Sequence, residues 1–239
     1  MTKMKLRQQT AFAIDLCSGM HYLHSCRPLM VMHRDLKPSN CLIDSYGRLK
    51  LCDFGLSKVV PVDREEREAS YKMTGATGTY RFMAPEVYRR EPHYDEKVDV
   101  YSFAMIFYNL LSGQAPWPTT IGTTVVFMTS RGERPPLGKN WDPRLQYLLK
   151  ECWHPDHTMR PSFARILDTL ISYQLAVHGG KNRSKKGSSA RHRQVSASSL
   201  ISFFSSSKKS SNSDRSTRLT RGVSTSSGTS LFSTASAPP

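Results

Sequence analysis

Paired cysteines are missing from this chain of 239 residues. It has five cysteines, an odd number, and no two of them stand in a Cys-x-x-Cys pattern. This usage argues against a disulfide framework and against a zinc site with the usual ligand spacing. Unpaired thiols fit a reducing compartment, so we expect a cytoplasmic protein or, failing that, a nuclear one.

Long apolar runs are missing as well. The longest mostly apolar run, residues 101–111, is about half of the roughly 20 residues that a helix needs to cross a bilayer. The N-terminus is basic but has no apolar stretch before a cleavage site, because Asp15 interrupts the one candidate. We therefore expect neither a signal peptide nor a transmembrane segment.

Acidic residues are scarce: 19 Asp and Glu stand against 34 Lys and Arg, which gives a formal charge of +15. The excess is unevenly placed, since eleven of the basic residues lie in residues 178–239, where Asp214 is the one acid. The preceding part of the chain is only mildly basic. The high overall charge therefore does not predict nucleic-acid binding, and no nucleic-acid partner is expected.

Apolar residues are few in residues 178–239, which contain twenty serines. Such a segment cannot bury enough apolar area to offset its ordering entropy, so we predict a disordered tail rich in Ser, Lys and Arg. Arginines stand upstream of Ser196 and Ser224, as basic-directed kinases prefer. The tail could contact acidic surfaces, and a plain solubilising extension is the alternative.

The most informative stretch of the chain is residues 33–40, which read HRDLKPSN. Asp35 could accept a proton from a hydroxyl nucleophile, and Lys37 could neutralise a phosphate during its transfer. Asn40 could offer its carbonyl oxygen to a hard cation such as Mg²⁺. This combination of an acid, a base and an amide indicates metal-assisted phosphoryl transfer.

A predicted hairpin brings a second oxygen ligand to the same place. Residues 41–43 and 49–52 read as two short strands across a turn at residues 44–47. Asn40 precedes the first strand and Asp53 follows the second, so their side chains are expected to lie near each other. Two oxygen ligands at the ends of adjacent strands suit a cation that bridges ATP phosphates.

These residues resemble the motifs of eukaryotic protein kinases, whose catalytic-loop pattern H-R-D-L-x-x-x-N is matched at every fixed position of residues 33–40. Further kinase motifs follow in the family's order: DFG at 53–55, APE at 84–86 and DVYSF at 99–103. Lys37 is typical of the Ser/Thr type of catalytic loop. Residues 51–58 and 78–86 look most like the tyrosine-kinase-like branch of Ser/Thr kinases.

The resemblance implies a protein serine/threonine kinase that uses Mg²⁺ and transfers the γ-phosphoryl group of ATP to Ser or Thr hydroxyls of a protein substrate, in signalling. The implied catalytic residues are Asp35, Lys37 and Asn40. Lys37, Asn40 and Asp53 would bind the nucleotide, and Asn40 and Asp53 would hold the Mg²⁺ ion. The residues implied as structural support are His33, Arg34, Phe54, Gly55, Thr79, Glu86, Asp99 and Arg160.

The resemblance also implies particular contacts for some of these supports. Glu86 and Arg160 are expected to form a buried ion pair, whose loss from one side would cost about 3–5 kcal/mol. Asp99 is expected to hold the backbone of the catalytic loop by hydrogen bonds. Thr79 is expected to contact Asp35 and the lysine two residues after it.

The segment between the DFG and APE motifs is rich in charges and hydroxyls and poor in apolar anchors. In this family a phosphate paired with Arg34 would order such a segment, so an upstream kinase is an expected partner. Thr77 is the favoured phosphorylation site, and Thr74 and Ser70 are the next candidates. A charged, solvated loop without regulation is the alternative.

The expected fold is mainly α: an α+β kinase-like fold with a large helical lobe and a short β-hairpin at the catalytic loop. Apolar side chains in residues 3–25 recur at helical spacing, and residues 29–32 read as a strand. We assign residues 1–177 to the kinase domain and residues 178–239 to the tail. Further helices are predicted over residues 96–111, 123–129, 144–152 and 162–177.

A glycine-rich loop of the form G-x-G-x-x-G is missing from the sequence. Few residues precede Asp35, so the resemblance covers residues 3–175 and corresponds to the larger lobe, without the small one. We expect a truncated chain that binds ATP poorly and transfers phosphate slowly or not at all, with an exposed surface around Phe54 and Met20. The alternative is a single-lobe docking or scaffold module without catalysis, although the intact Asp35, Lys37, Asn40 and Asp53 argue against it.

Overall fold

The computed structural model of the protein describes residues 4–63 and 78–178. The candidate phosphorylation sites Ser70, Thr74 and Thr77 lie outside the described residues, and so do residues 179–239 of the predicted tail. Helix-rich structure fills the described part, with two small antiparallel sheets beside it. This confirms a mainly helical protein with a hairpin at the catalytic loop. The division into kinase domain and tail stays a prediction.

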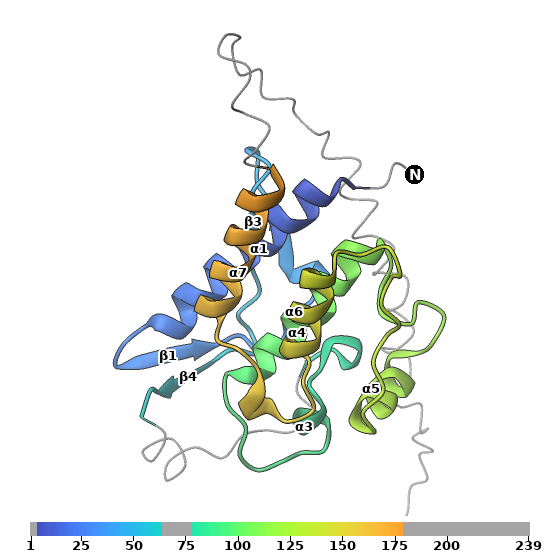
Figure 1. The fold of residues 1–239 in the computed structure, drawn as a ribbon. Coiled ribbons are helices and arrows are strands. Elements are labelled where there is room, and N and C mark those ends of the chain that lie inside the picture. The colour runs from blue at the N-terminus through green and yellow to red at the C-terminus, as the bar shows by residue number, and fades with distance from the viewer. Residues whose placement is uncertain (1–3, 64–77, 179–239) are drawn as a thin grey trace, which may run out of the picture.

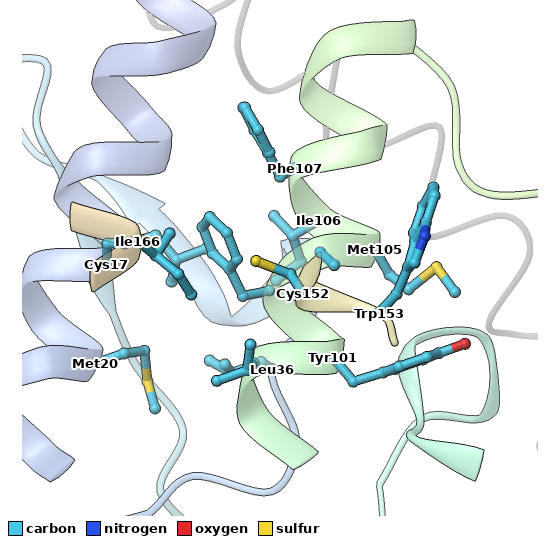
Figure 2. Close-up of a cluster of buried hydrophobic side chains, with 14 of the residues drawn as sticks. Cys17, Met20, Leu36, Tyr101, Met105, Ile106, Phe107, Cys152, Trp153 and Ile166 are labelled. Atoms are coloured by element: carbon cyan, nitrogen blue, oxygen red, sulfur yellow. The ribbon is translucent and has the colours of Figure 1, made fainter. Parts of the chain in front are cut away.

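Helix α4 (Lys97–Ser112) forms the centre of the core, because 14 of its 16 residues are buried. Its apolar side chains point in all directions around the axis, which is the pattern of a helix enclosed by other elements. Figure 2 shows Tyr101, Met105 and Ile106 of this helix packed with Cys152 and Trp153 from the neighbouring chain segment. The predicted helix at residues 96–111 is confirmed with a shift of one residue.

Helix α1 (Leu6–Ser25) and helix α7 (Phe163–His178) lie side by side in opposite directions (Figure 1). At one end the side-chain amide of Gln174 donates to Thr10 Oγ1 at 2.9 Å. At the other end the ring of His24 meets the ring of Phe163 edge-on, with centroids 5.1 Å apart. Both helices were predicted, α1 from the spacing of its apolar residues and α7 from helix start and stop signals.

The other helices are short and surround α4. The two predicted ones are α5 (Gly122–Ser130) and α6 (Pro143–Cys152), and α6 begins where the Asp142 carboxylate accepts the backbone N–H of Arg144. In residues 4–63 and 78–178 the remaining helical elements are one α-helix and three 3₁₀ turns: α3 (Pro85–Tyr88), η1 (Pro38–Asn40), η2 (Tyr80–Phe82) and η3 (His157–Met159).

The predicted hairpin is formed by β2 (Cys41–Ile43) and β3 (Leu49–Leu51), which pair in antiparallel fashion. Its turn is closed by the Asp44 carboxylate, which accepts the backbone N–H groups of Tyr46 and Arg48, both at 2.9 Å. Gly47 has φ +76, a conformation that glycine adopts at little cost. The sequence therefore encodes this turn locally.

The second sheet pairs β1 (Leu29–Met32) with β4 (Lys58–Pro61), again antiparallel. Strand β1 was predicted, whereas β4 was not. The residues of β4 are few and have no alternating pattern, and their partner strand lies far away in the sequence. The pairing fixes the chain on both sides of the catalytic loop and the DFG motif, because β1 leads into the former and β4 follows the latter.

One expectation about the surface is half wrong. Phe54 is 47% exposed, as expected, but Met20 is completely buried. Met20 lies one helical turn after Leu16 and therefore shares the inner face of α1.

In the part of the chain that the structure describes, no helix combines the length and the apolar character that a membrane crossing requires.

Candidate active site

The catalytic-loop residues follow strand β1 and are held by a carboxylate from α4. Asp99, in the first turn of that helix and fully buried, accepts the backbone N–H of His33 at 2.9 Å and that of Arg34 at 2.8 Å. Arg34 has φ +64, an uncommon conformation for a residue with a side chain. The two hydrogen bonds fix this turn of the backbone and thereby the direction of the next residue, Asp35.

The Asp35 carboxylate has contacts on both oxygens and is 6% exposed. Oδ1 accepts the Thr79 backbone N–H at 3.0 Å and the Thr79 hydroxyl at 2.9 Å. Oδ2 contacts the Lys37 ammonium group. The expected contact of Thr79 with Asp35 is therefore present, whereas no hydrogen bond joins Thr79 to Lys37 in residues 4–63 and 78–178.

Asn40 is oriented by the backbone of the same loop. Its Nδ2 group donates to the Asp35 backbone carbonyl at 2.9 Å and to Asp35 Oδ2 at 3.3 Å. The amide nitrogen is thus turned toward Asp35, and the amide oxygen Oδ1 is left to face other ligands. These two hydrogen bonds distinguish the two ends of the amide, since the nitrogen donates and the oxygen accepts.

The backbone places Asp53 beside Asn40. The Cys52 N–H donates to the Asn40 carbonyl at 3.0 Å, which extends the β2–β3 pairing to the residue before Asp53. Asp53 is exposed, has φ +65, and accepts the Gly55 N–H at 3.3 Å. The hairpin therefore brings the two predicted metal ligands to adjacent strand ends.

This pair fits a divalent cation that is shared with other oxygen ligands. Asn40 presents an amide oxygen and Asp53 a carboxylate, both of which Mg²⁺ accepts. In the described ranges no group of three or more His, Cys, Asp or Glu side chains could hold a metal ion. Mg²⁺ usually completes its shell with water and phosphate oxygens, so two protein ligands are sufficient for it.

His33, which the resemblance implies as a structural support, packs beneath Phe54. Its ring is fully buried, lies 5.2 Å from the Phe54 ring between centroids, and has Nε2 at 3.3 Å from the Cys52 carbonyl. These contacts join the catalytic loop to the segment after β3. The position is that of a structural residue, since its polar contact is with backbone and not with Asp35.

Gly78 lets the following segment reach the catalytic loop. Its φ is +103, and a Cβ atom there would lie 2.7 Å from the Arg34 carbonyl oxygen. Any side chain would therefore push the backbone away from the loop, because atoms cannot approach this closely without displacement. The close approach is what allows Thr79 to donate two hydrogen bonds to Asp35.

Arg34 and Lys58 place two cations next to each other beside the catalytic loop. Burial lowers the pKa of the Lys58 ammonium group, and the neighbouring Arg34 guanidinium lowers it further. Both groups also have other contacts. Two close cations disfavour each other's charge, and an anion between them would relieve this repulsion.

The ion pair expected between Glu86 and Arg160 is present. Arg160 Nη1 and Nη2 donate to the two Glu86 oxygens at 2.6 and 3.0 Å, and both side chains are buried. The guanidinium also stacks over the Tyr101 ring at 5.1 Å and donates to the Lys97 and His154 carbonyls. Arg160 therefore fastens α3, which follows the Thr79 segment, to the start of α4.

Several supporting residues could not be found from the sequence. Ser102 Oγ donates to the Phe82 carbonyl at 2.8 Å, and His24 Nε2 lies 2.9 Å from Asp99 Oδ2. Each contact joins residues that are distant in the chain. Ser102 lies in the DVYSF motif, but the motif does not indicate what its hydroxyl contacts, and His24 belongs to none of the motifs. Arg81 is a further case, since its guanidinium donates to the backbone carbonyls of Pro116, Trp117 and Thr120.

Comparison with known proteins gives a consistent result. A family model described as protein tyrosine and serine/threonine kinase matches residues 1–170. Serine/threonine-protein kinase VIK of Arabidopsis thaliana is 46% identical over 162 residues, which are 66% of this chain and 36% of that protein. Serine/threonine-protein kinase STY17 of the same species is 38% identical over 167 residues, 70% of this chain and 27% of that protein.

A third relative covers more of the chain. Serine/threonine/tyrosine-protein kinase HT1 of Arabidopsis thaliana is 36% identical over 204 residues, 82% of this chain and 49% of that protein. The chain thus spans less than half the length of each of these three curated relatives.

Proposed function

The chain belongs to the protein tyrosine and serine/threonine kinase family, and from this we propose that it transfers the γ-phosphoryl group of ATP to serine and threonine hydroxyls of proteins. The observation that carries the proposal is the group of side chains around Asp35. A nearly buried carboxylate in contact with Lys37, Asn40 and Thr79 has the composition that phosphoryl transfer to a hydroxyl requires.

Asp35 would orient the acceptor hydroxyl and take its proton. Oδ1 is fixed by the two hydrogen bonds from Thr79, so Oδ2 is the oxygen that the acceptor would meet. Lys37 now contacts Oδ2, and in the reaction its ammonium group would turn to the oxygens of the transferred phosphoryl group. The proton would pass from the acceptor hydroxyl to Asp35 while the new oxygen–phosphorus bond forms.

Asn40 and Asp53 would hold Mg²⁺, which supplies charge neutralisation for the phosphates when it is bound. The protein's part is to keep the two ligands at adjacent strand ends, through the β2–β3 hairpin and the Cys52–Asn40 hydrogen bond. ATP and Mg²⁺ are therefore proposed as the nucleotide and the metal of this site.

Regulation by an upstream kinase would act through Thr77, or else through Thr74 or Ser70. A phosphate on one of them would find a basic environment at Arg34 and Lys58, whose mutual repulsion it would relieve. Because Arg34 precedes Asp35 directly, such a phosphate would act on the catalytic loop through one residue. The proposed setting is signalling in the cytoplasm.

The experiment is to incubate the 239-residue chain with radiolabelled ATP, Mg²⁺ and a protein substrate and to identify the labelled amino acids. We expect label on phosphoserine and phosphothreonine that depends on Mg²⁺. Label on phosphotyrosine alone would contradict the proposed acceptor class. Absence of label above a protein-free control would contradict catalysis by this chain.

A second candidate is a docking module without catalysis, and the exposed apolar edge of the site favours it. Phe54 is 47% exposed and Leu56 is 41% exposed, and Gly55 alone separates them in the chain. Such a surface suits a protein partner. The substitution Asp35→Ala separates the two functions, since it should abolish phosphoryl transfer and leave partner binding unchanged.

A further inference from the structure

Helix α1 carries a carboxylate that none of the kinase motifs explains. Asp15 lies in the middle of this helix, and its side chain is 6% exposed. A carboxylate on a covered helix face is costly unless hydrogen bonds replace its lost water. Four such bonds are present, and all of them come from two consecutive residues, Arg48 and Leu49, at the beginning of β3.

The geometry of these bonds is that of a clamp on the strand. Arg48 Nη2 donates to Oδ1 at 2.6 Å and Nε donates to Oδ1 at 2.9 Å and to Oδ2 at 3.0 Å. The backbone N–H of Leu49 donates to Oδ2 at 2.9 Å. Planar guanidinium–carboxylate pairing with a second bond to the backbone fixes position as well as direction.

One helical turn further along α1, Gly19 provides a second contact with the same strand. A Cβ atom on Gly19 would lie 2.9 Å from Leu51 Cδ1, so Leu51 occupies the space that a side chain at position 19 would need. The distance between the two contacts is similar along both elements, because four residues of helix rise about 6 Å and two residues of strand rise about 6.6–6.8 Å. Asp15 and Gly19 therefore meet Leu49 and Leu51 in register.

We propose that Asp15 and Gly19 position Asp53 for cation binding by holding β3 in register on α1. Asp53 follows Leu51 by two residues, and the residue between them is bonded to the Asn40 carbonyl. Asn40 is also held on the catalytic loop by its bond to the Asp35 carbonyl, so a shift of β3 along the helix would strain the Cys52–Asn40 bond and move Asp53 relative to Asn40. Asp15 is a positioning residue in this role, because it contacts neither metal nor substrate, and the proposal rests on the metal pair of the proposed function.

The test uses Mn²⁺ as a paramagnetic substitute for Mg²⁺ with the isotopically labelled 239-residue chain. Titration with Mn²⁺ should broaden the amide signals near residues 40 and 53 in the unaltered chain. In Asp15→Ala the Mn²⁺ concentration for half-maximal broadening should rise about tenfold, the lower end of the effect that loss of an outer-shell partner has on a metal site. Amide exchange of Cys52 should also become faster.

A matched control is available on α6. The Asp142 carboxylate accepts Arg144 Nε at 3.1 Å, Arg144 Nη2 at 2.8 Å and the Arg144 backbone N–H at 2.9 Å. Asp142→Ala therefore removes a comparable set, a guanidinium pair and one backbone hydrogen bond, three bonds against the four of Asp15, at the start of α6 and not on β3. It should lower the melting temperature to a similar extent as Asp15→Ala and leave the Mn²⁺ titration unchanged.

Gly19→Ala separates position from stability. Alanine favours the helix more than glycine does, so the melting temperature should not fall, while Leu51 is displaced and Mn²⁺ binding weakens. Unchanged Mn²⁺ binding in Gly19→Ala would overturn the part assigned to Gly19. If Mn²⁺ broadens the signals near residues 40 and 53 in the unaltered chain and binds Asp15→Ala equally well, the positioning role of Asp15 is overturned and the metal pair stands. If Mn²⁺ causes no localised broadening in the unaltered chain, the metal pair is overturned and the positioning role with it.

Discussion

The two carboxylates of the candidate site have very different surroundings. Asp35 is 6% exposed and receives hydrogen bonds from a backbone N–H group and a hydroxyl, beside a lysine contact. Asp53 is exposed and accepts one long hydrogen bond, from the Gly55 N–H at 3.3 Å. The acceptor side of the site (Asp35, Lys37 and Thr79) is thus enclosed, and the cation side (residues 53–56) is open.

The difference in exposure follows from the contacts that hold each side in place. Its supports reach into the core: Asp99 holds the loop from α4, and Arg160 holds α3 through Glu86. The cation side is attached through the hairpin and through packing on His33. Substitutions in the supports of the acceptor side should therefore cost much more stability than substitutions on the cation side.

The largest effect is expected for Arg160→Ala. It leaves the buried Glu86 carboxylate without its partner, which should lower the free energy of unfolding by about 3–5 kcal/mol. Arg165→Ala is the matched control, because its pair with Glu151 has an arginine side chain that is 63% exposed. The control should cost at most about 1 kcal/mol. Equal losses in urea denaturation of the two variants would contradict the importance of burial.

The next effect is expected for Asp99→Ala, which leaves the His33 and Arg34 backbone N–H groups without their acceptor. Each buried unpaired group costs about 1–3 kcal/mol, and the loop should loosen. Hydrogen exchange at these two amides should become faster, and phosphoryl transfer should slow with it. Asp168→Ala on the exposed face of α7 is the control and should change neither the hydrogen exchange at these amides nor the rate of phosphoryl transfer. Unaltered exchange in Asp99→Ala would show that the loop is held by other contacts.

A smaller effect on stability, but a specific one on the site, is expected for Gly78→Ala. The positive φ should cost at least about 1 kcal/mol in this variant, and the new methyl group would also collide with the Arg34 carbonyl. Gly132→Ala has a φ of +94 and nothing within 4 Å of the new carbon, so it has the strain without the collision. Gly78→Ala alone should reduce the rate of transfer. A similar rate for both variants would argue against the Thr79–Asp35 contact in catalysis.

The smallest effect is expected on the cation side. Phe54→Ala removes a ring that is 47% exposed, so the loss in unfolding free energy should be about 1 kcal/mol. Leu36→Ala, in the enclosed part of the catalytic loop, removes a side chain that is 1% exposed and should cost about 2–5 kcal/mol. Thermal unfolding of the two variants measures the contrast between the sides. Similar losses would mean that Phe54 is packed more tightly than its exposure indicates.

The sequence predicts those parts of the molecule that local patterns encode. The spacing of apolar residues gives α1 and α4, and helix start and stop signals give α6 and α7. The turn residues around Gly47 give the hairpin that places Asn40 beside Asp53. Strand β4 was missed because it pairs with β1, which lies far away in the chain. Contacts of this kind leave no periodic signal.

The same limit applies to the candidate site. The motif residues Asp35, Lys37 and Asn40 are close in sequence, and the structure places them together as the motif suggests. The carboxylate clamp of Asp15 on Arg48 could not be predicted, because an acidic residue in an amphipathic helix usually faces solvent. Asp15 meets Arg48 and the Leu49 N–H because α1 packs against β3.

The most direct test of the account is the initial rate of phosphoryl transfer by Asp35→Asn compared with Asp142→Asn. Both substitutions remove one negative charge and keep the size of the side chain, but Asp142 lies at the start of α6, away from the site. We predict that Asp35→Asn slows transfer by about 10²- to 10⁴-fold, the usual contribution of a general base, and that Asp142→Asn leaves the rate unchanged. A rate for Asp35→Asn equal to that of the unaltered chain would contradict the central role given to Asp35.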